Sequence, residues 1–163
     1  MYYCCSYDSP VGMLTLASNG TELTGLWLQN QKYFARDHSC PVVRPELPVF
    51  LKTCAWLNRY FAGEPVASDL LPLKPAGTPF QQKVWNILQT IPYGQTLTYG
   101  QIAKLMGCPA ASQAVGSAVG HNPISIIIPC HRVLGSGGKL TGYAGGLNAK
   151  IWLLSHEGVL NLQ

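Results

Sequence analysis

The chain has 163 residues and a mass of 17.7 kDa, enough for one domain or two small domains with a buried core. Its composition is 47% hydrophobic and 11% charged, yet no apolar run approaches the roughly 18 residues that cross a membrane. We therefore expect a soluble globular protein without a membrane partner. The net charge of +4 and the pI near 8.8 are compatible with a polyanionic partner but do not by themselves indicate nucleic acid.

The first ten residues, MYYCCSYDSP, lack the basic and apolar regions of a secretory signal. We therefore expect a cytoplasmic monomer whose six cysteines are free thiols, because disulfides are rare in a reducing compartment. Cys4, Cys5, His38 and Cys40 fit no standard zinc spacing, and adjacent cysteines in a strand would point apart. The sequence therefore predicts neither a metal nor another cofactor.

Residues 2–29 alternate β-favouring runs with the turn signals DSPVG and SNGTE, which predicts a short antiparallel meander. A helix follows within residues 48–64, where Gly63 should end it. The apolar residues that recur along one stripe of this helix are Phe50, Cys54, Leu57 and Phe61. Residues 64–77 contain three prolines and no periodicity, so we place a linker there and divide the chain into domains 1–75 and 76–163.

The second part of the chain is predicted to be mostly helical. Its first helix should begin with Thr78 as N-cap, Pro79 at the first helical position and Gln81 completing a capping box. The residues expected to face inward are Phe80, Val84, Ile87 and Leu88. TYGQIAKLMG repeats the capping box with Thr98 and Gln101.

A second short helix is predicted in ASQAVGSAVG, with Val115 and Val119 as its buried stripe. Two short helices joined by the tight turn after Gly107 predict a helix-turn-helix. A last helix is expected over about residues 147–157, ending at Gly158.

The stretch NPISIIIPCHRVLG, residues 122–135, contains the strongest chemical signal. The β-branched run 126–128 favours a strand or an extended segment that is buried on both faces. Pro129 cannot donate to a strand ladder, so Cys130 should lie in the loop that follows. A free cysteine is most often a small buried hydrophobic residue, but His131 offers a base here and Arg132 a fixed positive charge that favours thiolate.

Adjacent residues of a strand point to opposite faces, so contact between His131 and Cys130 requires a bridging water or a loop geometry. An imidazole that acts as a base also needs a group to orient it. Glu157 is the only acidic residue after Asp69 and is therefore the candidate. The alternative for Glu157 is a solvated charge at the end of a helix.

IPCHRVLG, with HNP before it, TGYAGG after it and KIWLLSHEG near the end, closely resembles the O6-alkylguanine-DNA alkyltransferase family, also called methylated-DNA–protein-cysteine methyltransferases. GTPFQQKVWNILQTIPYGQTLTYGQIAKLMG is similar to the same family, so the resemblance covers nearly all of residues 77–158. It implies an α/β (α+β) protein. The N-terminal domain would be a ribonuclease-H-like sheet with a helix, and the mostly helical C-terminal domain would contain the helix-turn-helix and the active-site cysteine.

The resemblance implies that Cys130 takes an alkyl group from O6 of guanine in double-stranded DNA, with O4 of thymine as an open second substrate. The product is a stable thioether, so the protein would act once. His131 would be the base acting through a water, Glu157 would orient it, and Asn122 would hold the active-site turn. Because a stacked base is inaccessible, the nucleotide must be flipped, and Tyr99 matches the tyrosine that assists this step.

The remaining site residues are also implied by the resemblance. Small residues of the second helix would approach the minor groove, and the 143–144 loop would close over the base. The residues expected to contact DNA or the base are Gln113, Ala114, Gly116, Ser117, Arg132, Val133, Tyr143 and Ala144. Gln113 replaces the family's usual arginine, which predicts weaker DNA binding or slower flipping.

Three other functions use parts of the same pattern. A cysteine hydrolase would also need a thiol, a histidine and an acid, but it would turn over many times. A lesion-binding relative without catalysis would lack the cysteine, and a sequence-specific regulator would prefer one operator. Ser125 stands where some relatives have proline, a difference that bears on the size of the alkyl group accepted.

Overall fold

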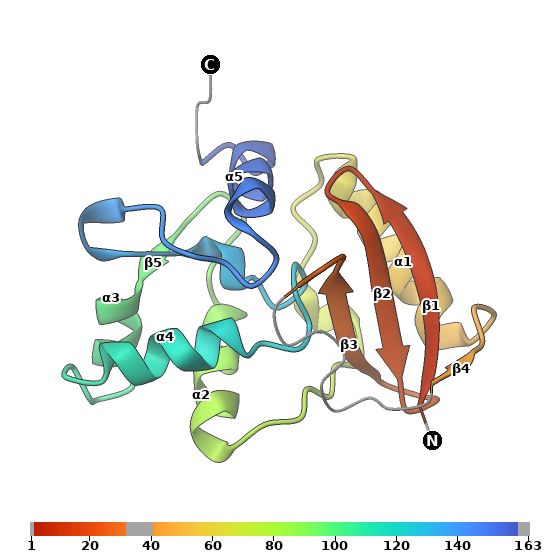
Figure 1. Ribbon diagram of the computed structural model, residues 1–163, viewed down its shortest axis with the longest axis horizontal. Helices are drawn as coiled ribbons and strands as arrows, with labels where there is room; N and C mark the ends of the chain where they lie inside the picture. The colour runs from red at the N-terminus through yellow and green to blue at the C-terminus, as the bar shows by residue number, and fades with distance from the viewer. Residues whose placement is uncertain (1, 32–40, 160–163) are drawn as a thin grey trace. The chain divides into compact units, whose positions relative to one another are not determined.

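The computed structural model describes residues 2–31 and 41–159 (Figure 1). The chain divides into two compact units, Met1–Ala76 with Pro123–Ser125, and Gly77–Asn122 with Ile126–Gln163. The first unit contains a four-stranded sheet and a helix, and the second is mostly helical. This confirms the mixed α/β fold class.

The N-terminal unit begins with the predicted meander. Strands β1 (Tyr3–Ser9), β2 (Gly12–Ser18) and β3 (Leu23–Leu28) pair antiparallel in sequence, and β4 (Val42–Val43) adds to β1 in parallel, giving the order β3-β2-β1-β4. The β1–β2 turn is tight because Gly12 adopts a φ of 102°, which a residue with a side chain rarely does. Every residue of β3 is buried, as expected of a strand covered on both faces.

Helix α1 (Pro48–Phe61) packs against β1 and β2 on one face of this sheet (Figure 1). Phe50 and Leu57 of the predicted stripe are fully buried, whereas Cys54 and Phe61 are only half-buried. The other buried residues of the helix are Val49, Thr53, Trp56 and Tyr60. The buried face is therefore wider than one stripe and is rotated from the predicted one, because the position of the sheet decides which side is covered.

The C-terminal unit contains five helical segments that position the site and a final helix. They are α2 (Pro79–Leu88), α3 (Tyr99–Leu105), α4 (Ser112–Gly120), η2 (Cys130–Arg132), η3 (Ser136–Gly138) and α5 (Leu147–His156), with a small parallel pair of strands, β5 (Leu97–Thr98) and β6 (Val133–Leu134). Both predicted capping boxes are present, at Thr78 with Gln81 and at Thr98 with Gln101. These caps satisfy backbone groups that would otherwise lack partners.

Helix α2 buries Val84 and Leu88 as predicted, but Phe80 and Ile87 are only half-buried. The sequence pattern missed Trp85, which is buried and donates from Nε1 to the Ala118 carbonyl at 2.8 Å. Helices α3 and α4 pack together and are joined by a short turn in which Gly107 has a φ of 76° (Figure 1). Val115 and Val119 are buried as predicted, which confirms the helix-turn-helix arrangement.

The prediction that residues 126–128 form a strand or an extended segment is wrong, whereas their predicted burial is confirmed. These isoleucines are buried, at 1%, 2% and 0% exposed, but they form a turn in which Ile126 has a φ of 71°. A β-branched residue rarely adopts this left-handed conformation, so the surrounding contacts must enforce it. Burial alone produced the apolar run that sequence reasoning took for a strand.

No helix among the described residues is long and apolar enough to cross a membrane. The five cysteines within residues 2–31 and 41–159 are free thiols. The same residues contain no cluster of three or more potential metal ligands, and His38 and Cys40 lie outside them.

Candidate active site

Cys130 begins the 3-10 turn η2, directly after Pro129, and its side chain is 3% exposed. His131 and Arg132 complete the turn and are buried with it, although a lone charged residue would be costly there. Asn122, which follows α4, stabilises the approach to this turn. Its Nδ2 donates to the Ile128 carbonyl at 2.8 Å, so the turn before Cys130 is held from a residue six positions earlier.

Glu157 holds the imidazole of His131. Glu157 caps the C-terminal end of α5, and its Oε2 lies 2.6 Å from His131 Nε2, with both side chains fully buried. A carboxylate can only accept, so Nε2 carries the hydrogen. Glu157 is thus an internal partner of His131 rather than a solvated charge at the helix end.

The His131 side chain is neutral in this setting and has one ring nitrogen available. Burial lowers the pKa of His131 below its ordinary value, although Glu157 acts in the opposite direction. With the hydrogen on Nε2, Nδ1 keeps its lone pair. This atom is buried and has no hydrogen-bond partner among the residues that the structure describes. A buried imidazole with a fixed tautomer and a free lone pair can act as a base.

Arg132 lies inside the protein, which corrects its assignment to the DNA-contacting residues. It is 7% exposed, its Nε donates to Glu157 Oε1 at 2.7 Å, and its Nη1 donates to the Ile91 carbonyl at 2.7 Å. The guanidinium also lies 5.8 Å from the ring centroid of Tyr93. Its charge is therefore used to pair with Glu157, so its assigned role in favouring a Cys130 thiolate also needs revision.

The pKa of Glu157 reflects these two partners. Burial would raise this pKa, but the hydrogen bonds from His131 and Arg132 and the positive charge of Arg132 outweigh burial and lower the pKa from its ordinary value to about 2. Glu157 is therefore ionised at neutral pH. By contrast, burial and the neighbouring Cys54 and Cys4 raise the pKa of the Cys5 thiol to about 12, which makes Cys5 a poor nucleophile.

Sequence reasoning missed Lys150, which is 1% exposed in α5. Its Nζ donates to the Val133 carbonyl at 2.6 Å and to the Thr141 carbonyl at 3.4 Å. The only sequence signal was the position of Lys150 in the helix. Lys150 lies four residues after Gly146, which precedes α5, and on the face of α5 opposite the exposed Asn148. A lysine in a helix is usually exposed, so this signal was too weak to use.

Tyr99 occupies the first position of α3 and connects to the loop before α5. Its hydroxyl lies 3.1 Å from Thr141 Oγ1. Gly116 of α4 faces the Tyr99 ring, because a Cβ on this glycine would lie 3.8 Å from the ring, an ordinary contact. Tyr143 and Ala144 are half-buried in the same loop, and the Tyr143 carbonyl accepts from the Gly146 amide at 2.9 Å.

The exposed start of α4 borders a hollow of about 440 Å³. The hollow is lined by Thr98, Tyr99, Gly100, Ser112, Gln113, Ser136 and Gly137. Gln113, Ala114 and Ser117 are exposed on α4 and Gly116 is half-buried, so these four residues form one accessible face of the helix. Val133 is fully buried, and its carbonyl already accepts from Lys150.

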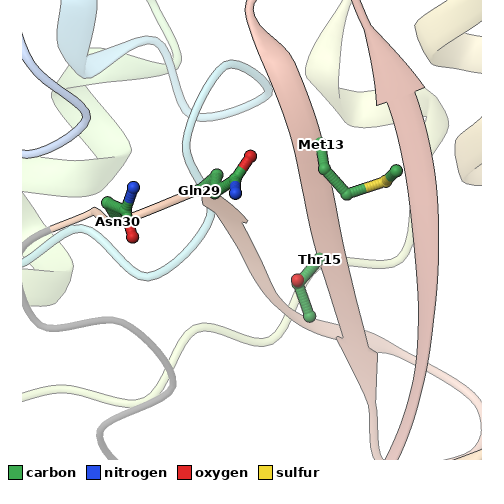
Figure 2. Close-up of a pocket in the computed structure, with 4 residues that line it drawn as sticks. All are labelled: Met13, Thr15, Gln29 and Asn30. Carbon is green, nitrogen blue, oxygen red and sulfur yellow. The ribbon is translucent and has the colours of Figure 1, made fainter.

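A second hollow, of about 370 Å³, lies in the N-terminal unit (Figure 2). Met13 and Thr15 reach it from β2, and Gln29 and Asn30 border it just after β3. None of these four side chains is a nucleophile or a base near neutral pH, so this hollow offers no catalytic group.

The sequence matches two family models. Residues 79–159 match the DNA binding domain of 6-O-methylguanine DNA methyltransferase, and residues 2–75 match its ribonuclease-like domain. The chain is 50% identical over 158 residues to the methylated-DNA–protein-cysteine methyltransferase of Mycobacterium tuberculosis, covering 96% of this chain and 93% of the relative. The chain belongs to the methylated-DNA–protein-cysteine methyltransferase family.

Other members of this methyltransferase family agree in sequence and in fold. The relative from Mycobacterium leprae is 48% identical over 157 residues, covering 96% of this chain and 93% of its own. The crystal structure of Mycobacterium tuberculosis OGT in complex with DNA superimposes with a TM-score of 0.86 at 49% identity, covering 96% of this chain and 91% of that chain. The resemblance noted in the sequence is thus confirmed over both halves of the chain.

Proposed function

We propose that this protein repairs DNA by transferring an alkyl group from O6 of guanine to its own Cys130, once per molecule. The observation that carries the proposal is the buried cluster in which Cys130 adjoins His131, and Glu157 fixes the His131 tautomer at 2.6 Å. Family membership and the DNA complex of Mycobacterium tuberculosis OGT support the same activity. We therefore treat the protein as a single-turnover methylated-DNA–protein-cysteine methyltransferase.

The proposed reaction begins when His131 Nδ1 takes the proton of the Cys130 thiol through a bridging water. The carboxylate of Glu157 stabilises the imidazolium that forms, as the acid of a catalytic triad does. The thiolate then attacks the alkyl carbon, a sulfur–carbon bond forms and the carbon–O6 bond breaks, with the electron pair going to guanine. Guanine regains a proton at N1, which balances the proton that the thiol lost.

The proposed substrate is a flipped nucleotide, because Cys130 is 3% exposed and an O6 alkyl group within a stacked duplex cannot reach it. Tyr99 and the face of α4 at Gln113, Ala114, Gly116 and Ser117 would contact DNA from the minor groove side. Tyr143 and Ala144 would close over the base. The Val133 carbonyl already accepts from Lys150 with one lone pair, so it would accept from the guanine amino group with the other.

The test is mass spectrometry of the protein after incubation with duplex DNA that contains O6-methylguanine. We expect one methyl-sized increment per chain, located on the peptide with Cys130 and absent from Cys130→Ser. Cys4→Ser, which removes a half-buried thiol of the N-terminal unit, is the matched control and should be methylated like the wild type. A methyl group on another residue, or none, would refute the proposal.

The same experiment separates the competing functions. A cysteine hydrolase would release its product and continue beyond one equivalent of substrate, whereas the thioether stops the reaction. A regulator would bind one DNA sequence without any mass change. Running the reaction with O4-methylthymine DNA tests the second substrate. We also place the protein in the cytoplasm, where the reduced state of the described cysteines would be maintained.

A further inference from the structure

Lys150 links three segments of the C-terminal unit with one buried ammonium group. It lies in the first half of α5, and its Nζ donates to Val133 of β6 and to Thr141 of the loop before α5. The Val133 amide in turn donates to the Cys130 carbonyl, closing η2. The lysine therefore holds the residue that ends the turn containing the nucleophile.

The same ammonium group is also connected to the residue proposed to assist base flipping. Thr141, whose carbonyl accepts from Lys150, meets the Tyr99 hydroxyl at 3.1 Å through its own side chain. The turn at Cys130, the loop with Tyr143 and Ala144, and the start of α3 thus share one set of hydrogen bonds. Removing Lys150 would break the two bonds to Val133 and Thr141, through which the Cys130 turn and the loop are joined.

The charges of the cluster give Lys150 a second role. Glu157 is anionic and pairs with Arg132, while His131 is neutral, so these three groups sum to no charge. Lys150 forms no ion pair with a carboxylate among residues 2–31 and 41–159. Burial lowers the pKa of Lys150, and the group that opposes this effect is the Cys130 thiol.

We propose that Lys150 is a positioning residue that holds the Cys130 turn against the 141–144 loop and supplies the positive charge that balances the Cys130 thiolate. The proposal rests on the alkyl transfer proposed above. It assigns to Lys150 the electrostatic role that the sequence suggested for Arg132, whose charge Glu157 already neutralises. In this proposal His131 takes the proton of the thiol, and Lys150 stabilises the resulting anion.

A further consequence concerns the protein after the reaction. A thioether cannot ionise, so alkylation of Cys130 removes the group whose thiolate form can balance the Lys150 ammonium. A buried cation without a counter-ion loses its proton more easily. The Lys150 pKa should therefore fall when Cys130 becomes methylated, which couples the chemical state of the nucleophile to the charge of α5.

The first test measures how the rate of Cys130 alkylation by iodoacetamide depends on pH, without DNA, by mass spectrometry of the Cys130 peptide. In Lys150→Met the midpoint of the profile should move up by about one pH unit, so that the rate near pH 7 falls about tenfold. In Lys150→Arg, which keeps the charge, the midpoint should lie close to that of the wild type. Lys83→Met removes an exposed lysine of α2 and should behave like the wild type.

An unchanged midpoint in folded Lys150→Met, or the same shift in Lys83→Met, would overturn the proposal. If Lys150→Met does not fold, the charge role can be tested in the wild type. Nuclear magnetic resonance of the lysine carbons next to the ammonium groups follows the titration of Lys150. The Lys150 signal should titrate at lower pH after methylation of Cys130 than before, and identical titrations would refute the charge role. Absence of methyl transfer in the wild type would instead count against the proposed function alone.

Discussion

At the scale of single residues, Glu157 holds the site together because one carboxylate accepts from both His131 and Arg132. All three side chains are buried, so each polar group depends on the others for its hydrogen bonds. Two exposed ion pairs of the N-terminal unit, Arg44–Glu46 and Arg59–Glu64, have no such dependence.

Replacing Glu157 by glutamine should lower the free energy of unfolding by roughly 3–5 kcal/mol, because the Arg132 charge would remain buried without an anion. Methyl transfer should fall as well, since an amide offers one acceptor oxygen to the two donors His131 and Arg132 and has no charge to stabilise the imidazolium. Urea denaturation gives the first quantity and single-turnover kinetics the second. Glu64→Gln, which breaks an exposed pair, is the control and should cost less than about 1 kcal/mol. Equal losses in the two variants would contradict this account.

Stability should also fall in acid for a reason that lies in this cluster. The pKa of Glu157 is about 2 in the folded protein and near 4.5 in the unfolded chain, so its contribution is complete above about pH 4.5 and disappears as the pH falls toward about 2. The lowered pKa of His131 acts in the same direction from about pH 6.5 downward. Urea unfolding should show a loss of stability between about pH 4.5 and 2 that Glu157→Gln largely removes, whereas the part due to His131 should remain.

The sequence identified Cys130, His131 and Glu157, but it gave Lys150 no role and placed Arg132 on the DNA. The first three follow from a nucleophile, a base and the only acid near the end of the chain. Whether an arginine or a lysine points inward depends on tertiary packing, which local pattern does not contain. Arg132 and Lys150 are both buried against expectation, and each is satisfied by carbonyls from distant segments.

At the scale of elements, the parts governed by local chemistry were the most predictable. Both capping boxes and the β1–β2 turn depend on residues within four positions, and all are present. The prediction for residues 126–128 failed because tertiary contacts, such as the hydrogen bond from Asn122, set their conformation. Their own β propensity does not decide it.

Asn122→Ala should destabilise the turn before the nucleophile. The buried Ile128 carbonyl would keep only the Cys130 amide as a donor, and the loss of one hydrogen bond should cost about 0.5–1.5 kcal/mol. Asn122→Asp should be no better, because a carboxylate cannot donate. Both variants should slow methyl transfer more than Asn58→Ala, which breaks an exposed side-chain bond to Tyr7. The unfolding free energy and the transfer rate should be measured for each variant. An Asn122 variant that loses stability but keeps its transfer rate would contradict the prediction.

Helix α4 is where this protein should differ in DNA handling from relatives that carry an arginine. Gln113 is exposed at the start of the helix and borders the hollow beside Tyr99. Glutamine fills a gap in the base stack but lacks the charge and the planar stacking group of arginine. Gln113→Arg should therefore bind DNA more tightly and raise the rate of flipping or transfer. Stopped-flow fluorescence of a base analogue separates the two steps, and no gain in either would contradict the prediction.

At the scale of the whole molecule, charge limits how strongly DNA can be held. The chain has eleven lysines and arginines, and the burial of Arg132 and Lys150 leaves nine at most for phosphates. Each phosphate contact contributes about −0.9 to the slope of log affinity against log salt. The slope should thus be no steeper than about −8. Fluorescence anisotropy with Cys130→Ser, which binds without reacting, measures it, and a steeper slope would require more than one protein per site.

The division into two units also bears on how the protein is built. We propose that residues 1–75 and 76–163 are its domains, with one exception in the contact pattern, since Pro123–Ser125 belongs to the N-terminal unit. There, Leu26 donates to the Pro123 carbonyl and accepts from the Ser125 amide, and Ser125 Oγ donates to Gln31. The segment that leads to the nucleophile is therefore fastened to the edge of β3.

The pairing of residues 123–125 with β3 affects the order in which the newly synthesised chain folds. Leu26 and Ile124 pair across about 100 residues of sequence, a separation that makes the contact slow to form compared with a helix or a hairpin. Synthesis proceeds from the N-terminus, so β3 can already be folded when residue 124 emerges and can serve as its template. The segment that precedes Cys130 would then take its place only after β3 has formed.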